Sequence, residues 1–148
     1  MIKVGVTLNL CITMDCNQKC PDCCNGMSLK TRTRDYASVE EIIEAGKMLG
    51  HFDIITVSGG EPTTHPNFPE IVKATAENYD YRLLVLASNG FRLMEPSNYA
   101  ALSYFNRVSL RKYVAPRTWE LSSNPKCGID NTKVADEFIA NKPDDLNL

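Results

Sequence analysis

The chain has 148 residues, of which 43% are hydrophobic and 23% charged, and its formal net charge is −2. These values are typical of a single soluble globular domain, so a strongly basic nucleic-acid-binding protein is disfavoured and nucleic acid is not indicated as a partner. No apolar run is long enough to span a bilayer, and the N-terminus lacks the apolar core of a signal peptide. We therefore expect a cytoplasmic protein with no membrane partner.

Strands and helices are predicted to alternate along most of the chain. Short apolar stretches rich in β-branched residues predict strands at residues 4–10, 53–58, 82–87 and 107–110. Helices are predicted between them at residues 38–49, from Asn67 or Pro69 to residue 79, and at 96–104, the first opened by a capping box. The pattern fades after Tyr113, and a last helix is predicted at residues 133–140.

The predicted strands lack a polar and apolar alternation, which is typical of a parallel sheet buried on both faces. In such α/β sheets, ligands bind at the carboxyl ends of the strands. Three polar segments follow strands here: the cysteine-rich stretch 11–25, the turn 59–62 and the turn 88–90. We expect all three to meet on one face. His65 follows the second turn, and we interpret it as a loop residue or helix cap rather than a catalyst.

Five of the six cysteines lie between Cys11 and Cys24, which is unlike the spread of a disulfide framework and favours metal binding. Cys16, Cys20 and Cys23 are spaced C-x₃-C-x₂-C. Three thiolates on a tight loop hold three irons of a [4Fe–4S] cluster and leave the fourth iron open to a ligand. Alternatively, Cys11 or Cys24 completes a zinc site, and the protein is a zinc-stabilised binding module without catalysis.

The cysteine spacing directly after the first predicted strand resembles the signature of the radical S-adenosylmethionine (radical SAM) superfamily. The sequence Gly59-Gly60-Glu61-Pro62 after the second strand resembles a second motif of that family. Together these motifs and the intervening strands cover roughly the first 110 residues. The segment from Cys20 to Asn25 is also similar to the C-P-x-C-x-N form found in activating enzymes for glycyl-radical proteins, such as the anaerobic ribonucleotide reductase activase.

The resemblance implies a fold of the α/β class: a shortened, partial (β/α) barrel with a parallel sheet, of the TIM-like radical SAM type. It implies one core domain over residues 1–148, with recognisable βα units in 1–113 and an irregular C-terminal segment in 114–148. The implied cofactors are a [4Fe–4S] cluster and S-adenosylmethionine (SAM).

Among the cysteines, the family spacing favours Cys23 over Cys24 as the third ligand, although Cys16, Cys20 and Cys24 are also evenly spaced. We expect Cys11 and Cys127 to be buried and inert.

The resemblance also implies SAM-binding roles for residues at three strand ends, and no catalytic side chain. These are Gly59, Gly60, Glu61 and Pro62 for the amino group, Ser88 and Asn89 for the ribose or the methionyl part, and Ser109 and Arg111 for the ribose and the carboxylate. The chain departs from many family members at Asp22, where they have an aromatic residue that packs on adenine.

The implied chemistry is the reductive cleavage of SAM to a 5′-deoxyadenosyl radical, which abstracts hydrogen from a substrate. A low-potential electron donor such as flavodoxin is expected as a partner. Two substrate classes are compatible with the motifs: a glycine of a partner protein, as in activating enzymes, or a small molecule or peptide. Because the chain is short for a complete barrel, we expect the substrate protein or a second copy of the chain to close it.

Overall fold

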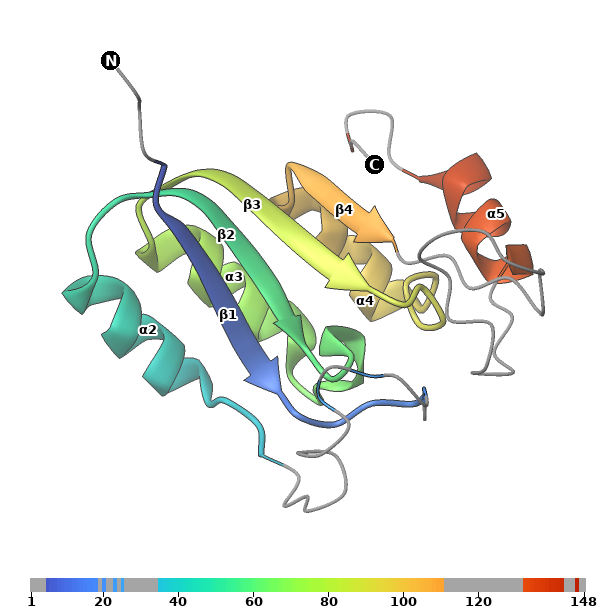
Figure 1. Ribbon diagram of the computed structural model, residues 1–148, viewed down its shortest axis with the longest axis horizontal. Coiled ribbons are helices and arrows are strands. Elements are labelled where there is room, and N and C mark those ends of the chain that lie inside the picture. Colours follow the sequence, from blue (N-terminus) through green and yellow to red (C-terminus); the bar gives the residue numbers. More distant parts are fainter. Residues whose placement is uncertain are drawn as a thin grey trace.

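The computed structural model of the chain describes residues 5–18, 20, 23, 25, 35–110, 132–142 and 146. Its centre is a four-stranded parallel sheet whose strand order, β1-β2-β3-β4, follows the order of the chain (Figure 1). The strands are β1 (Thr7–Thr13), β2 (Phe52–Gly59), β3 (Tyr81–Ser88) and β4 (Arg107–Leu110). The prediction of a parallel α/β fold is therefore confirmed.

Helices follow the strands as the sequence predicts. They are α2 (Val39–Met48), α3 (Phe68–Asn78), α4 (Pro96–Ala101) and α5 (Thr132–Asn141), with two short 3₁₀ helices, η1 (Pro62–Thr64) and η2 (Leu102–Tyr104). The capping box is present, since Ser38 Oγ accepts from Glu41 N (3.1 Å) and Glu41 Oε2 accepts from Ser38 N (2.7 Å). None of the helices in the described ranges is long and apolar enough to cross a membrane.

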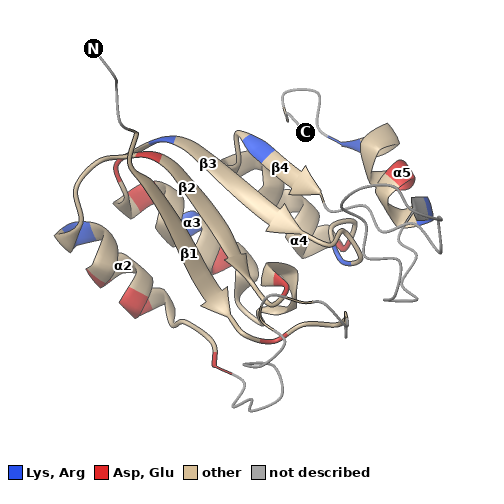
Figure 2. Ribbon diagram, in the orientation of Figure 1, with Lys and Arg blue, Asp and Glu red and all other residues tan. Residues whose placement is uncertain are grey.

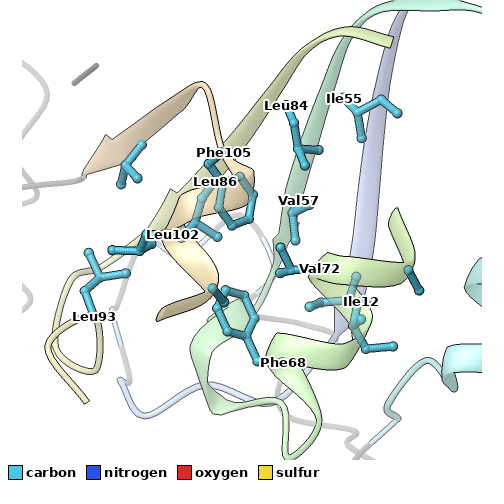
Figure 3. Packing of buried hydrophobic residues seen from close by; sticks show 14 of the residues in the cluster. Ile12, Ile55, Val57, Phe68, Val72, Leu84, Leu86, Leu93, Leu102 and Phe105 are labelled. Carbon is cyan, nitrogen blue, oxygen red and sulfur yellow. The ribbon is translucent and has the colours of Figure 1, made fainter. Parts of the chain in front are cut away.

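The core lies between one face of the sheet and the helices α2, α3 and α4 (Figure 1). Ile55 and Val57 of β2 and Leu84 of β3 are fully buried there, against helix residues such as Phe68 and Val72 (Figure 3). The helix α5 lies beyond β4, and the Tyr99 hydroxyl of α4 donates to its Asn141 carbonyl (2.6 Å).

The other face of the sheet is less covered than the sequence predicts. Along β2, Ile54, Thr56 and Ser58 alternate with the core residues and are only half-buried. The expectation that the strands are buried on both faces is therefore wrong for β2, and the same alternation is seen in β1. Charged residues on the sheet gather where the strands begin, so the strand bodies are uncharged (Figure 2).

The first strand begins later and ends later than predicted, at Thr13 instead of residue 10. Cys11 therefore belongs to the strand, and its side chain is exposed because it lies on the face opposite the helices. The prediction of a buried Cys11 is wrong for this reason. Cys127 lies outside the described residues.

The packing of α2 on α3 predicts the effect of one substitution. A Cβ at Gly46 would lie 2.7 Å from the Asn78 carbonyl oxygen and 2.8 Å from the Tyr79 ring. We expect Gly46→Ala to lower the free energy of unfolding by about 1–3 kcal/mol through overpacking, despite the better helix propensity of alanine.

Gly50→Ala is the matched control, because a Cβ at Gly50 meets no atom within 4 Å. Denaturant unfolding of both variants measures the difference. A Gly46→Ala protein as stable as the wild type would show that this helix contact is not tight.

Candidate metal and cofactor site

The ends of β1 and β2 are joined by a close backbone contact. Gly60 N donates to the Thr13 carbonyl and Glu61 N donates to the Asp15 carbonyl, both at 2.8 Å. A Cβ on Gly60 would lie 2.2 Å from the Asp15 oxygen, and one on Gly59 would lie 2.2 Å from the Thr13 oxygen. Both positions therefore require glycine, because the start of the cysteine loop runs directly against them.

The Glu61 carboxylate joins β2 to β3. Its side chain is 1% exposed. Oε1 accepts from Thr63 N (3.2 Å), Thr63 Oγ1 (2.6 Å) and Ser88 Oγ (2.8 Å). Oε2 accepts from Asn89 N (2.7 Å). A buried carboxylate needs such donors to be stable, so these bonds hold the two strand ends together around it.

The loop that carries the cysteines is closed at its base. After the loop, Ala37 N donates to the Ile12 carbonyl (2.9 Å), so the returning chain lies beside the end of β1. The Tyr36 hydroxyl donates to Asp15 Oδ2 (3.1 Å). The loop therefore leaves and rejoins the sheet at the edge where Glu61 lies.

The three predicted cluster ligands, Cys16, Cys20 and Cys23, are partly buried free thiols on this loop. Burial raises the pKa of the Cys16 thiol, whereas the N–H of Gln18, 3.4 Å from its Sγ, lowers it. The charges of Glu61, Cys20 and Cys23 raise this pKa further, so these groups lie near Cys16.

No three His, Cys, Asp or Glu side chains within the described residues are grouped to hold a single metal ion. In a [4Fe–4S] cluster each thiolate binds a separate iron, so its ligands do not converge on one ion. The soft thiol donors of this loop fit such a cluster, and their assignment as ligands stays a prediction.

The structure brings together most of the predicted SAM-binding residues. Gly59, Gly60, Glu61, Ser88 and Asn89 lie at one edge of the sheet, and the buried Pro62 begins η1 there. Ser109 lies on β4, paired in register with Ala87 and exposed. Arg111, Asp22 and Cys24 lie outside the described residues.

Thr63 was not identified from the sequence. A glutamate that caps a short turn with a threonine two residues later is the signal that would have found it.

His65 connects the turn after Glu61 to the residues that follow the cysteine loop through a hydrogen bond. Its ring is 4% exposed. Because Nδ1 accepts from Asn67 N (3.0 Å), the proton is on Nε2, which donates to the Ala37 carbonyl (2.9 Å). The ring also meets the Tyr36 ring edge-on at 5.2 Å. This placement fits the expected loop and capping role.

Comparisons with known proteins identify the family and the fold of the chain. The family model described as "Radical SAM superfamily" matches residues 10–110. Among curated proteins, a GTP 3′,8-cyclase of Pasteurella multocida is 30% identical over 89 residues, covering 58% of this chain and 26% of the relative. A GTP 3′,8-cyclase of Klebsiella pneumoniae is 34% identical over 91 residues, covering 58% of this chain and 27% of the relative. The matched part thus spans about a quarter of these curated relatives.

Solved structures show a shared fold. The structure of native anSMEcpe with bound AdoMet and Cp18Cys peptide has a TM-score of 0.61 at 19% identity, covering 93% of this chain and 39% of that chain. BtrN in an open conformation has a TM-score of 0.55 at 22% identity, covering 74% of this chain and 51% of that chain.

The neutral form of His65 predicts a pH dependence of stability. Burial lowers the pKa of His65 below its ordinary value of 6.5, and the Ala37 carbonyl and the Glu70 charge oppose this shift. The unfolded state therefore binds the proton more readily than the folded state. The contribution of His65 is fully present above about pH 6.5 and decreases as the pH falls through that value.

Denaturant unfolding under reducing conditions at pH 7.5 and pH 5.5 measures this change. In His65→Gln the difference between the two pH values is expected to be smaller than in the wild type. An identical difference in both proteins would contradict the neutral buried ring.

Proposed function

Because the chain belongs to the radical SAM superfamily, we propose that it binds SAM at the edge where β1, β2 and β3 end and generates a radical that abstracts hydrogen from a substrate. The family match confirms the expected enzyme class and its two cofactors, a [4Fe–4S] cluster and SAM. When bound, the reduced cluster supplies the electron that splits SAM into methionine and the 5′-deoxyadenosyl radical.

The observation that supports this proposal most is the contact between the cysteine loop and the Gly-Gly-Glu-Pro turn. The bonds from Gly60 N to Thr13 and from Glu61 N to Asp15, each 2.8 Å, place Cys16 next to the turn. A molecule bound to an open iron would therefore be within reach of the turn. In this arrangement Cys16, Cys20 and Cys23 hold the cluster.

Glu61 supplies the negative charge that an ammonium group needs in a site shielded from water. The Ser88 hydroxyl donates to Glu61 Oε1 (2.8 Å) and accepts from Gly90 N (3.0 Å). Because its donor is used within the protein, Ser88 acts in our proposal by orienting Glu61, and the Asn89 N–H does the same from the other oxygen.

For the substrate, we propose a small molecule or a peptide. The curated relatives are named as GTP 3′,8-cyclases, and a solved structure of similar fold contains a peptide together with AdoMet. The sheet face opposite the helices carries uncharged polar groups, among them Asn9 and Ser58, and the Ser58 hydroxyl donates to Asn9 Oδ1 (2.5 Å).

A glycine of a partner protein is the second candidate, supported by the C-P-x-C-x-N form of residues 20–25. In either case, a low-potential donor such as flavodoxin supplies electrons. A second copy of the chain, or the substrate protein where the substrate is a glycine of a partner, closes the barrel.

Anaerobic reconstitution with iron and sulfide, followed by SAM and dithionite, tests the proposed chemistry. The wild type is expected to yield 5′-deoxyadenosine. Single Cys16→Ala, Cys20→Ala and Cys23→Ala variants are expected to lose the cluster and the product, because each removes one of the three iron-bound thiolates. Cys11→Ala is the matched control and should retain both, since Cys11 is exposed on the strand.

A cluster-loaded wild type that releases no 5′-deoxyadenosine would contradict the function. Normal iron content in Cys23→Ala, together with its loss in Cys24→Ala, would contradict the choice of the third ligand.

The charge of Glu61 predicts a separate effect on SAM. Glu61→Gln is expected to weaken SAM binding by on the order of tenfold or more, because a charge-assisted hydrogen bond contributes about 1.5–3 kcal/mol. Iron and sulfide content should stay near that of the wild type. Equilibrium dialysis under anaerobic conditions measures the affinity.

Glu44→Gln makes the same chemical change on the exposed side of α2 and serves as the control. Unchanged SAM affinity in Glu61→Gln would contradict the assigned role of the carboxylate.

A further inference from the structure

Two asparagine side chains join the cysteine segment to the ends of different strands. Asn25 Nδ2 donates to the Gly59 carbonyl at the end of β2 (3.0 Å). Asn17 Oδ1 accepts from Asn89 Nδ2, just after β3 (2.8 Å). These bonds span 34 and 72 residues of sequence, so they are tertiary contacts that hold the loop to the sheet.

The donor and acceptor roles in both bonds follow from their partners. A backbone carbonyl only accepts, so the Asn25 amide must donate to Gly59. Asn89 Oδ1 accepts from Phe91 N (3.2 Å), which leaves its Nδ2 facing Asn17. The contact at Asn25 therefore requires a side chain that donates a hydrogen bond.

The hydrogen bond of Asn25 contacts the end of the cysteine segment that the backbone hydrogen bonds do not reach. The backbone hydrogen bonds from Gly60 N and Glu61 N reach the carbonyls of Thr13 and Asp15, which precede Cys16, the first predicted cluster ligand. Asn25 lies two residues after Cys23, at the far side of the cysteine segment. The hydrogen bond from Asn25 therefore holds the C-terminal end of the cysteine segment against the Gly-Gly-Glu-Pro turn.

We propose that Asn25 is a positioning residue that fixes the cysteine segment against the Gly59 carbonyl and thereby sets the distance between the cluster and the SAM-binding turn. This inference rests on the proposed function. SAM has to reach both the open iron and the turn, so a loop already held in place binds it without an additional ordering cost. Loss of the hydrogen bond between Asn25 and Gly59 therefore weakens SAM binding, whereas cluster binding depends on the three thiols.

Asn25→Asp tests this proposal, because a carboxylate of the same shape cannot donate to the Gly59 carbonyl. We expect the dissociation constant for SAM to rise about tenfold, the effect of one lost hydrogen bond that leaves a partner unsatisfied. Iron and sulfide content should match the wild type. The change that SAM causes in the EPR spectrum of the reduced cluster should require correspondingly more SAM.

Gln18→Glu is the matched control for the added charge. It makes the same amide-to-carboxylate change in the same loop, and the Gln18 side chain makes no hydrogen bond to the other described residues. Its SAM affinity is expected to stay within about threefold of the wild type, less than the effect of one lost hydrogen bond. Asn25→Ala removes the hydrogen bond without adding charge and should reproduce the tenfold loss of SAM affinity. This variant also replaces Asn25→Asp in the test if Asn25→Asp does not fold.

A second readout uses the metal-free protein. Deuterium uptake in the peptide that covers residues 16–25 should be faster in Asn25→Asp than in the wild type and unchanged in Gln18→Glu. This difference tests the hydrogen bond between Asn25 and Gly59 even if the wild type does not bind SAM. Failure of the wild type to bind SAM would contradict the proposed function instead.

Equal losses of SAM affinity in Asn25→Asp and Gln18→Glu would assign the effect to charge and overturn the proposal. Wild-type SAM affinity in both Asn25 variants would overturn it as well. Loss of the cluster itself in Asn25→Ala would show that the residue serves cluster binding, which also contradicts the proposed role.

Discussion

The close backbone contact between the loop after β1 and the turn after β2 determines where the rest of the site lies. At Gly59 and Gly60 the loop backbone comes so near that a Cβ would meet an oxygen at 2.2 Å. Two backbone hydrogen bonds of 2.8 Å, donated by Gly60 N and Glu61 N, then hold the chain in place just before Cys16. The structure therefore requires glycine at both positions, because any side chain there would displace the cysteine loop from the sheet edge.

A buried negative charge extends this junction to the third strand. The Glu61 carboxylate is 1% exposed and accepts bonds from Thr63, Ser88 and Asn89. Without these donors the buried charge would be strongly unfavourable, so the turn, β3 and Glu61 stabilise one another. Burial raises the pKa of the nearby Cys16 thiol, and the charge of Glu61 adds to that increase. A site with an acidic side chain and thiols close together favours cationic partners, which agrees with the cofactors of the family.

Much of the fold could be predicted because its local signals agree with its tertiary structure. The strand at residues 107–110 and the capping box at Ser38 were predicted as observed. The end of β1 was missed because the local sequence at Cys11 and Thr13 is compatible with either strand or loop. Their pairing with Ser58 and Gly59 of β2 makes them part of the strand. The contact of Asn25 with Gly59 depends on which segments meet in space, so local sequence alone does not identify it. The contact of Thr63 with Glu61 is local, and the capping pattern of the turn would have identified it.

In the proposed function, one sheet edge brings the cluster and SAM together. Electron–nuclear double resonance on the reduced, cluster-loaded protein with SAM labelled with ¹⁵N in its amino group tests it most directly. A resolved coupling between the cluster and that nitrogen, weakened in Gly60→Ala, is the predicted result. A loaded cluster that shows no coupling at saturating SAM would contradict the account.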